Sequence, residues 1–215
     1  RRVLQRLADA GVGRVVVNVL HFASQITQYL SENNNFGLDI AISDETEGLL
    51  ETGGGIKHAA RLFDAESPVL IHNVDILSNV NLRKFYNIAA ESEVAATPVD
   101  AVLLVSWRKT KRYLLFDDDM RLVGWTNIET GEVKSPYPEL DPRKCRMYAF
   151  AGIHVISPRM FPLMDAFPEK FSIIDFYLKT CATHNIKGYV KDDLKLMDIG
   201  KLDTLAQAET FLSEL

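Results

Sequence analysis

The sequence predicts an α/β fold built on a parallel, doubly wound sheet, with an antiparallel hairpin inserted into it. In the first third of the chain, short apolar runs rich in β-branched residues alternate with segments of helical periodicity. The apolar runs are nearly continuous, which is typical of strands buried on both faces. From Ala101 to Trp125, three strand patterns instead follow one another with only short polar turns, as in antiparallel hairpins.

The elements of the first third follow from their apolar patterns. Val3, Leu4 and Leu7 form one face of a helix, and Gly11 stands where that helix would end. Composition rich in Val, Ile and Leu predicts strands at 14–19, 38–42 and 68–73. Between them, helical spacing predicts helices at 22–30 and from the glycines at 53–55 to residue 63.

The later elements are justified in the same way. Strands are predicted at 101–106, 113–116 and 121–125, and Asp117-Asp118-Asp119 forms a turn between the last two. We expect Trp107 and Trp125 to lie in the core of this hairpin region. The segment 126–146 is polar and rich in Gly and Pro, so we expect a long loop, which is often functional. The remaining elements are a strand at 148–156, helices at 158–163 and 172–183, strands at 186–190 and 195–198, and a helix at 202–212.

The composition is that of a folded globular protein, with 47% hydrophobic and 25% charged residues, and we expect one domain over 1–215. The net charge of -5 argues against nucleic-acid and membrane partners. The two cysteines form no CxxC and no zinc-ligand spacing, so we interpret them as reduced thiols of a cytoplasmic protein. No apolar run approaches the ~20 residues that span a bilayer. Homo-oligomer formation is left open.

Two acidic residues at strand ends are candidates for a metal site. Asp75 follows the apolar strand 68–73, and ligands bind beyond the carboxyl ends of strands in open α/β sheets. Asp198 ends a second apolar strand and is followed by Ile199-Gly200. Each could simply cap the segment that follows it. Taken together, the two carboxylates form a candidate site for Mg²⁺, which binds hard oxygen ligands and substrate phosphates.

A third candidate is the run Leu50-Glu51-Thr52-Gly53-Gly54-Gly55. Glycines at the start of a helix let a ligand approach the backbone and leave N–H groups pointing outward. The alternative is a flexible turn before a helix. The run is not a Walker A loop, because no Lys-Ser/Thr pair follows at the required spacing. The basic stretch Arg108 to Arg112 is either a solvated face or a further phosphate contact.

Four motifs in this order resemble the sugar-1-phosphate nucleotidyltransferases over essentially the whole chain. The resemblance is closest to a short bacterial subgroup that contains N-acetylmuramate-1-phosphate uridylyltransferases and mannose-1-phosphate guanylyltransferase-like proteins. The motifs are Leu50 to Gly55, Asn73-Val74-Asp75, Ala151-Gly152-Ile153 and Met197-Asp198-Ile199-Gly200-Lys201.

The resemblance implies a Rossmann-like nucleotidyltransferase fold of GT-A type, with a mixed, mostly parallel sheet and helices on both faces. It implies transfer of a nucleotidyl group from an NTP to a sugar 1-phosphate, giving an NDP-sugar and pyrophosphate. The residues that it assigns are the catalytic, Mg²⁺-binding Asp75 and Asp198, the nucleotide-binding Thr52, Gly53, Gly54 and Asn73, and the sugar-binding Gly152.

The chain departs from the family pattern in two places. Val74 stands where the family usually has Gly between the Asn and the Asp. The family also begins with a strand and a GxGxRxxPxT-type loop that grips the triphosphate, and Arg1 corresponds to the helix after that loop. We therefore expect the complete protein to carry this loop upstream, and the stretch 1–215 alone to be inactive.

Two other functions fit part of this pattern. A non-catalytic nucleotide-binding or regulatory module of the same fold would have less need of both Asp75 and Asp198. A GT-A glycosyltransferase would carry a DxD-type metal motif. Asp117-Asp118-Asp119 contains one formally, but it falls in a predicted hairpin turn.

Overall fold

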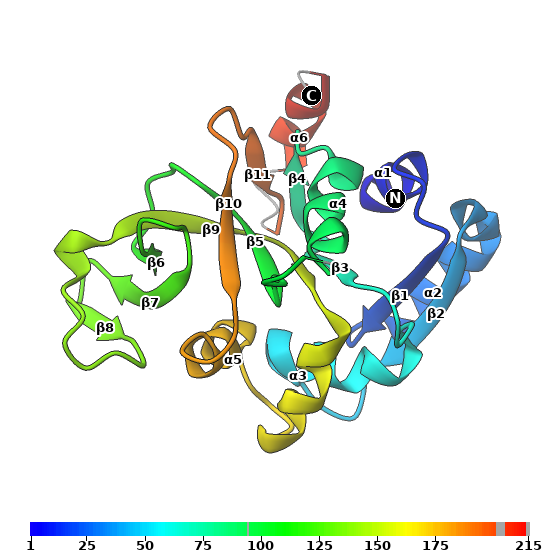
Figure 1. Cartoon of the computed structure of the whole chain (residues 1–215). Coiled ribbons are helices and arrows are strands. Elements are labelled where there is room, and N and C mark those ends of the chain that lie inside the picture. Colours follow the sequence, from blue (N-terminus) through cyan, green and yellow to red (C-terminus); the bar gives the residue numbers. More distant parts are fainter. Residues whose placement is uncertain (94, 201–204, 214–215) are drawn as a thin grey trace. The chain divides into compact units, whose positions relative to one another are not determined.

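The structure of the chain, a computed structural model, describes residues 1–93, 95–200 and 205–213. It divides into two compact units, whose helices and strands are labelled in Figure 1. The first unit comprises Arg1–Ser67 and Pro158–Phe176, and the second comprises Pro68–Ser157 and Tyr177–Leu215. No described helix is long and apolar enough to cross a bilayer.

The first unit is a β-α-β arrangement followed by a glycine-rich helix. Its helices are α1 (Arg2–Asp9), α2 (Ala23–Glu32) and α3 (Glu51–Ala59), and its strands are β1 (Arg14–Val19) and β2 (Asp39–Asp44). The strands pair in parallel, with Arg14 opposite Asp39 and Val19 opposite Asp44. Short 3₁₀ segments complete the unit: η1 (Asn34–Gly37), η2 (Ala60–Leu62) and η4 (Pro158–Ala166). The parallel β1–β2 pair that the alternating pattern predicted is therefore present.

The second unit is built on a sheet with strand order β10-β5-β9-β6-β7-β8, in which β3 also pairs with β9. The pair β10–β5 is parallel and the other pairs of this sheet are antiparallel. The strands are β3 (Val69–His72), β5 (Ala101–Ser106), β6 (Arg112–Phe116), β7 (Leu122–Asn127), β8 (Glu132–Lys134), β9 (Arg146–Ile156) and β10 (Ile186–Val190). A separate antiparallel pair consists of β4 (Ile76–Ser78) and β11 (Leu196–Asp198).

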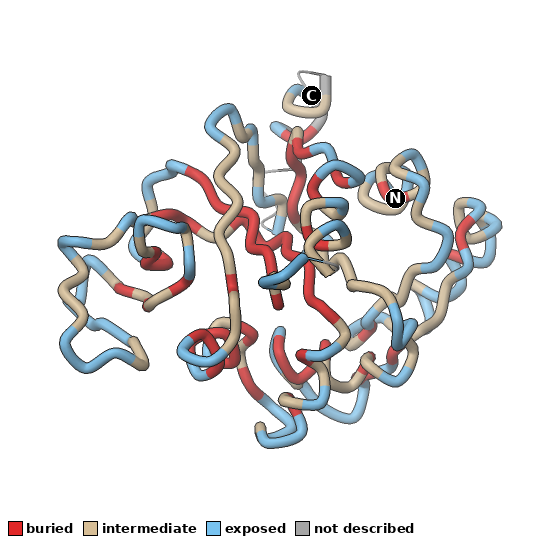
Figure 2. Tube along the Cα trace, viewed as in Figure 1, coloured by how far each residue is buried: buried red, intermediate tan, exposed pale blue. Residues whose placement is uncertain are grey.

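The centre of this unit is the buried pair β5–β9. Every residue of β5 is buried, and most residues of β9 are buried as well (Figure 2). Side chains such as Leu103, Leu104 and Val105 expose no surface. Burial on both faces explains why the β5 sequence is apolar at every position from 101 to 105 rather than alternating.

Three helices need comment. Helix α4 (Leu82–Ser92) was not predicted, although Asn81 caps it by accepting the Lys84 N–H and Leu82, Phe85 and Ala89 are buried at helical spacing. Helix α5 (Ile173–Thr180) lies within the predicted helix 172–183. Helix α6 (Leu205–Ser213) matches the predicted terminal helix, whose expected start at Leu202 falls outside the described residues, as does Lys201.

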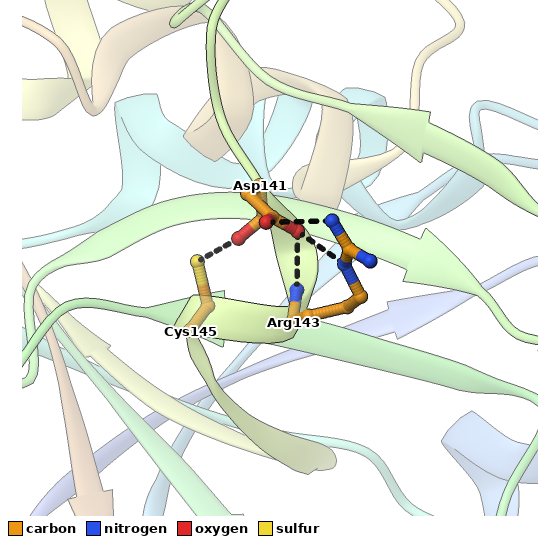
Figure 3. A network of polar contacts seen from close by, with 3 residues as sticks. All are labelled: Asp141, Arg143 and Cys145. Carbon is orange, nitrogen blue, oxygen red and sulfur yellow. Dashed lines mark hydrogen bonds and ion pairs between the residues drawn. The ribbon is translucent and has the colours of Figure 1, made fainter.

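The predicted long loop 126–146 contains regular structure that its composition concealed. Strand β8 pairs with β7, and the 3₁₀ segment η3 (Pro142–Lys144) precedes β9. Asp141 organises η3, because its carboxylate accepts bonds from the backbone N–H and the guanidinium of Arg143, and its carbonyl accepts from the Cys145 thiol (Figure 3). Hydrogen bonds from Arg143 lower the pKa of the Asp141 carboxyl. These contacts fix the chain as it enters β9.

The expectation that both tryptophans are core residues is wrong for Trp107. Trp125 is half-buried on β7, with the Lys134 ammonium 5.3 Å from its ring centroid. Trp107 exposes 69% of its surface. It directly follows Ser106, the last residue of β5, where the chain leaves the sheet.

Candidate active site

Asp75 and Asp198 come together in the second unit through the β4–β11 pair. Asp198 lies opposite Ile76 in this pair, and the Ile199 N–H donates to the Asp75 carbonyl at 2.8 Å. The two carboxylates also converge on the same point: a Cβ added at Gly200 would lie 3.1 Å from Asp198 Oδ1 and 3.1 Å from Asp75 Oδ2. The structure thus brings together two acidic residues that are far apart in the sequence.

This pair has the chemistry of a Mg²⁺ site that is completed by substrate. Asp198 is exposed and Asp75 is half-buried, so phosphate oxygens and water could reach both carboxylates. The described residues contain no cluster of three or more His, Cys, Asp and Glu side chains suited to a metal. Mg²⁺ typically binds through one or two carboxylates together with waters and substrate phosphates, so a two-carboxylate set fits this ion. A glycine at position 200 leaves the space between the carboxylates free of a side chain.

Asn73 and Gly152, assigned to nucleotide and sugar, are also neighbours in this unit. The Asn73 N–H donates to the Gly152 carbonyl at 3.1 Å. Gly152 has φ of 73°, and a Cβ there would lie 2.9 Å from Asn73 Nδ2. A side chain at 152 would therefore be strained and would displace the Asn73 amide. Because Asp75 is two residues from Asn73, the predicted metal, nucleotide and sugar residues of this unit lie at one end of β3.

The glycine run belongs to the first unit, and it is built differently from the prediction. Helix α3 begins at Glu51, so the glycines lie inside its first turns. The N–H groups of Gly53 and Gly54 do not point freely outward, because they donate to the Phe171 carbonyl at 2.9 and 3.2 Å. Thr52 Oγ1 accepts the Ile173 N–H at 3.1 Å. The segment 169–173 thus satisfies backbone groups at the start of α3.

Close packing explains why residues 53 and 54 are glycines. A Cβ at Gly53 would lie 2.4 Å from the Phe171 ring, and one at Gly54 would lie 2.1 Å from the Glu169 carbonyl oxygen. Glu51, which has φ of 62°, turns the chain into the helix in a conformation that non-glycine residues adopt rarely. The glycines are therefore required by the segment that packs on α3, whatever they contact in addition.

Sequence analysis missed a buried acidic residue beside this run. Glu45 is buried, accepts the Asn18 side-chain amide at 2.6 Å, and its Oε1 would lie 2.6 Å from a Cβ at Gly55. Burial raises the pKa of the Glu45 carboxyl. The one signal in the sequence was an acidic residue directly after β2, and nothing in the pattern distinguishes it from the exposed Asp44.

Substitution of Gly54 by Ala is expected to destabilise the protein strongly. The new Cβ would overlap a backbone carbonyl, which cannot rotate away as a side chain can, so we expect a loss of about 3 kcal/mol. Urea unfolding followed by circular dichroism measures the change. Gly48→Ala is the matched control, because a Cβ at Gly48 would meet nothing within 4 Å. Equal stability of the two variants would show that segment 169–173 does not pack on α3 as described.

The aspartates at 117–119 form a turn, as predicted. Asp117 Oδ1 accepts the N–H groups of Asp119 and Arg121, at 3.0 and 2.8 Å, and Asp118 pairs with Arg146 at 3.2 Å. The Asp117 carboxylate therefore closes the β6–β7 hairpin. This use of the motif argues against a DxD-type metal site.

Comparison with known proteins decides the family. A family model described as nucleotidyl transferase matches residues 1–214. The chain belongs to the nucleotidyl transferase family. This nucleotidyltransferase is 29% identical over 220 residues to an N-acetylmuramate alpha-1-phosphate uridylyltransferase of Caulobacter vibrioides, covering 99% of the chain and 83% of the relative. A uridylyltransferase of the same name from Neisseria meningitidis is 34% identical over 87 residues, which is 40% of the chain and 37% of the relative.

Solved structures agree with this nucleotidyltransferase in fold. HddC from Yersinia pseudotuberculosis has a TM-score of 0.71 at 22% identity, covering 98% of the chain and 84% of the neighbour. The inositol-1-phosphate CTP transferase from T. maritima has a TM-score of 0.69 at 15% identity, covering 99% and 80%. These structures confirm the predicted α/β fold. The family model and the uridylyltransferase relatives, rather than the solved structures, bear out the predicted sugar-1-phosphate nucleotidyltransferase activity. The non-catalytic module and the glycosyltransferase are not favoured.

Proposed function

We propose that Asp75 and Asp198 hold the catalytic Mg²⁺ of this nucleotidyltransferase. The observation that carries the proposal is the convergence of both carboxylates on Gly200. In the same proposal Asn73 contacts the nucleotide and Gly152 the sugar, while Thr52, Gly53 and Gly54 line the nucleobase. The neighbouring positions of Asn73, Asp75 and Gly152 around the end of β3 support the first two roles.

The reaction requires positioning and charge neutralisation more than acid–base chemistry. The phosphate oxygen of the sugar 1-phosphate attacks the α-phosphorus of the NTP, and the bond from that phosphorus to the β-phosphate oxygen breaks to release pyrophosphate. The attacking oxygen is already ionised at neutral pH, so no side chain has to remove a proton from it. Bound Mg²⁺ would neutralise the negative charge of the phosphates. Asp75 and Asp198 would place that ion, and Asn73 and Gly152 would orient the reactants.

We propose UTP and an N-acetylmuramate-type sugar 1-phosphate as the substrates. The names of the two uridylyltransferase relatives support both choices, and one of these relatives matches 99% of this chain. A cytoplasmic location follows from the same proposal, since nucleoside triphosphates are cytoplasmic substrates. The unpaired thiols Cys145 and Cys181 agree with a reducing compartment.

Pyrophosphate release by the full-length protein tests the proposed function. The reaction is followed with Mg²⁺ against a panel of four NTPs and several sugar 1-phosphates. We expect the highest kcat/KM with UTP and N-acetylmuramate 1-phosphate. Pyrophosphate release with a different pair would change the proposed substrates but would still support nucleotidyl transfer to a sugar 1-phosphate. If the folded protein released no pyrophosphate with any pair, the proposed reaction would be refuted for every substrate in the panel.

A further inference from the structure

Trp107 is an exposed aromatic side chain in the second unit that the proposed reaction does not use. It directly follows Ser106, the last residue of β5, and exposes 69% of its surface. Tryptophan is highly buried on average, and its amphipathic ring is enriched at interfaces, where one end is apolar and the other is wet. Its place at the carboxyl end of a strand of the central sheet is the kind of place where α/β proteins bind ligands.

The indole of Trp107 is supported from one side by fixed aromatic residues. Its ring centroid lies 4.6 Å from that of Tyr148 on β9, at an interplanar angle of 59°. Tyr148 is only 6% exposed and packs edge-on against the buried Phe116 at 6.1 Å. Because the support is buried and the indole is exposed, the outer face of the ring is available to a ligand without any rearrangement of the core.

The residues that follow Trp107 are also held in place. The Arg108 guanidinium donates to the Phe150 carbonyl on β9 at 3.0 Å. The Tyr113 hydroxyl donates to the Arg108 carbonyl at 3.3 Å and accepts the Thr110 N–H at 3.1 Å. These bonds tie 107–110 to β9 and to β6, so the aromatic surface is preorganised, which reduces the entropy lost on binding.

This surface lies along the same strand as the proposed sugar contact. Tyr148 and Gly152 are four residues apart on β9, a span of at most about 13 Å at ~3.3 Å per residue. The pairing of β9 with β5 shifts in register between Phe150 and His154, and Gly152 has φ of 73°, so β9 departs from regular strand geometry there. The Arg108 guanidinium reaches the Phe150 carbonyl, two residues before Gly152. A substituent on a sugar ring held at Gly152 could extend along β9 toward the indole.

The charge around Trp107 indicates what such a substituent carries. Residues 108–112 include Arg108, Lys109, Lys111 and Arg112, in a chain whose net charge is -5. Lys111 pairs with Glu129 at 2.8 Å, whereas the Arg108 guanidinium bonds to a neutral carbonyl that leaves its charge uncancelled. Lys109 is exposed next to Arg108. An aromatic face bordered by these cations suits a group that combines apolar atoms with a carboxylate.

We propose that Trp107 and Lys109 form a specificity subsite for an acidic substituent of the acceptor sugar, remote from the phosphate that reacts. The indole contacts the apolar atoms of the substituent, and Lys109 attracts its carboxylate. The subsite discriminates a sugar 1-phosphate that carries a carboxylate-bearing ether from one with a hydroxyl at the same carbon. This inference rests on the proposed function, because it requires Gly152 to contact the sugar.

Steady-state kinetics with two acceptors tests the subsite. For Trp107→Ala we expect KM for N-acetylmuramate 1-phosphate to rise about 10-fold, the size of a lost aromatic contact. KM for N-acetylglucosamine 1-phosphate, which lacks the acidic ether, and KM for UTP should stay unchanged. Trp107→Phe should recover most of the affinity. For Lys109→Ala we expect about a threefold rise with the acidic sugar alone. Lys111→Ala is its matched control, because Lys111 is paired with Glu129.

The outcomes separate this inference from the proposed function. Suppose that the wild type is active with both sugars and that Trp107→Ala leaves KM for the acidic sugar unchanged. That result would overturn the subsite, and the proposed reaction would stand. A rise in KM for UTP alone would place the nucleotide at Trp107 and also overturn it. Fluorescence of the Trp125→Phe variant, in which Trp107 is the only tryptophan of the chain, gives a readout without turnover. The acidic sugar phosphate should quench it, and absence of quenching at saturation would contradict the contact.

Discussion

Replacing Asp75 by Asn is expected to lower kcat for pyrophosphate release about 1000-fold, since a metal ion supplies several kcal/mol of charge stabilisation and each 1.36 kcal/mol is tenfold in rate. Asn keeps the shape of Asp but loses the negative charge that attracts Mg²⁺. Asp198→Asn should have a similar effect, because both carboxylates converge on Gly200. The double variant should be little worse than either single variant, as for residues that act as one unit. Activity is measured over a range of Mg²⁺ concentrations.

Asp193→Asn is the matched control for these variants. Asp193 lies between β10 and β11, is exposed and pairs with Lys191. Its substitution removes the same charge from the same region, and activity should stay within about twofold of wild type, as expected for an exposed ion pair. Thermal unfolding should show all the variants folded. If Asp75→Asn kept the activity of Asp193→Asn at every Mg²⁺ concentration, Asp75 would not be a metal ligand.

The second large effect concerns stability in acid and depends on His154. This residue of β9 is 2% exposed, its Nδ1 lies 2.6 Å from the Tyr177 hydroxyl, and its ring packs against Phe150 and Tyr177. Burial lowers the pKa of His154 from 6.5 to about 3. Burial also raises the pKa of Tyr177, so the hydroxyl stays neutral and can donate to the imidazole. The folded protein thus holds a neutral histidine inside its second unit.

A lowered histidine pKa makes the folded state less stable as the pH falls. Below pH 6.5 the unfolded chain binds a proton at this residue and the folded protein does not, until the pH approaches 3. Between pH 7 and pH 4 we therefore expect the free energy of unfolding to lose about 3 kcal/mol through His154 alone. The measurement is urea unfolding of wild type and of His154→Gln at several pH values.

His154→Gln keeps a side chain that can accept the Tyr177 hydroxyl but cannot be protonated in this range. It will be less stable than wild type at pH 7, because its fit to the cavity is imperfect. The decisive quantity is the difference between the two proteins, which should shrink by about 3 kcal/mol from pH 7 to pH 4. Parallel stability curves over that range would show that His154 titrates normally, and hence that it is not buried as neutral imidazole.

Local patterns in the sequence were sufficient for most of the elements, because burial on both faces gives a strand such as β5 an unbroken apolar run. They failed at α4, where apolar residues at 82, 85 and 89 fit a helix but are separated by a mixture of polar and apolar residues. They also failed for β8, all three residues of which are exposed, so no alternation marks the strand. Pairing with β7 creates that strand, and pairing is not visible in one segment alone.

Residues of the candidate site could be predicted from the sequence only where their position relative to a strand suggests a role. Asp75 and Asp198 each follow or end an apolar run, and the β4–β11 pair then brings them together. The contacts of Gly54 with Glu169 and of Glu45 with Asn18 join segments far apart in the chain, and no spacing rule anticipates them. Trp107 was misplaced because its hydrophobicity suggests burial, whereas its exposure depends on where β5 ends.

The β7–β8 turn has a practical use. Its tip, at residues 128–131, closes through Gly131, whose φ is 73°, and the adjoining β8 is exposed throughout. Exposed hairpin tips of this kind tolerate inserted sequence, because little packing depends on them. A fluorophore or an affinity handle placed there would leave β5, β9 and the aspartates at the β4–β11 pair untouched. The enzyme could thus be tethered to a surface by this hairpin and its turnover watched one molecule at a time.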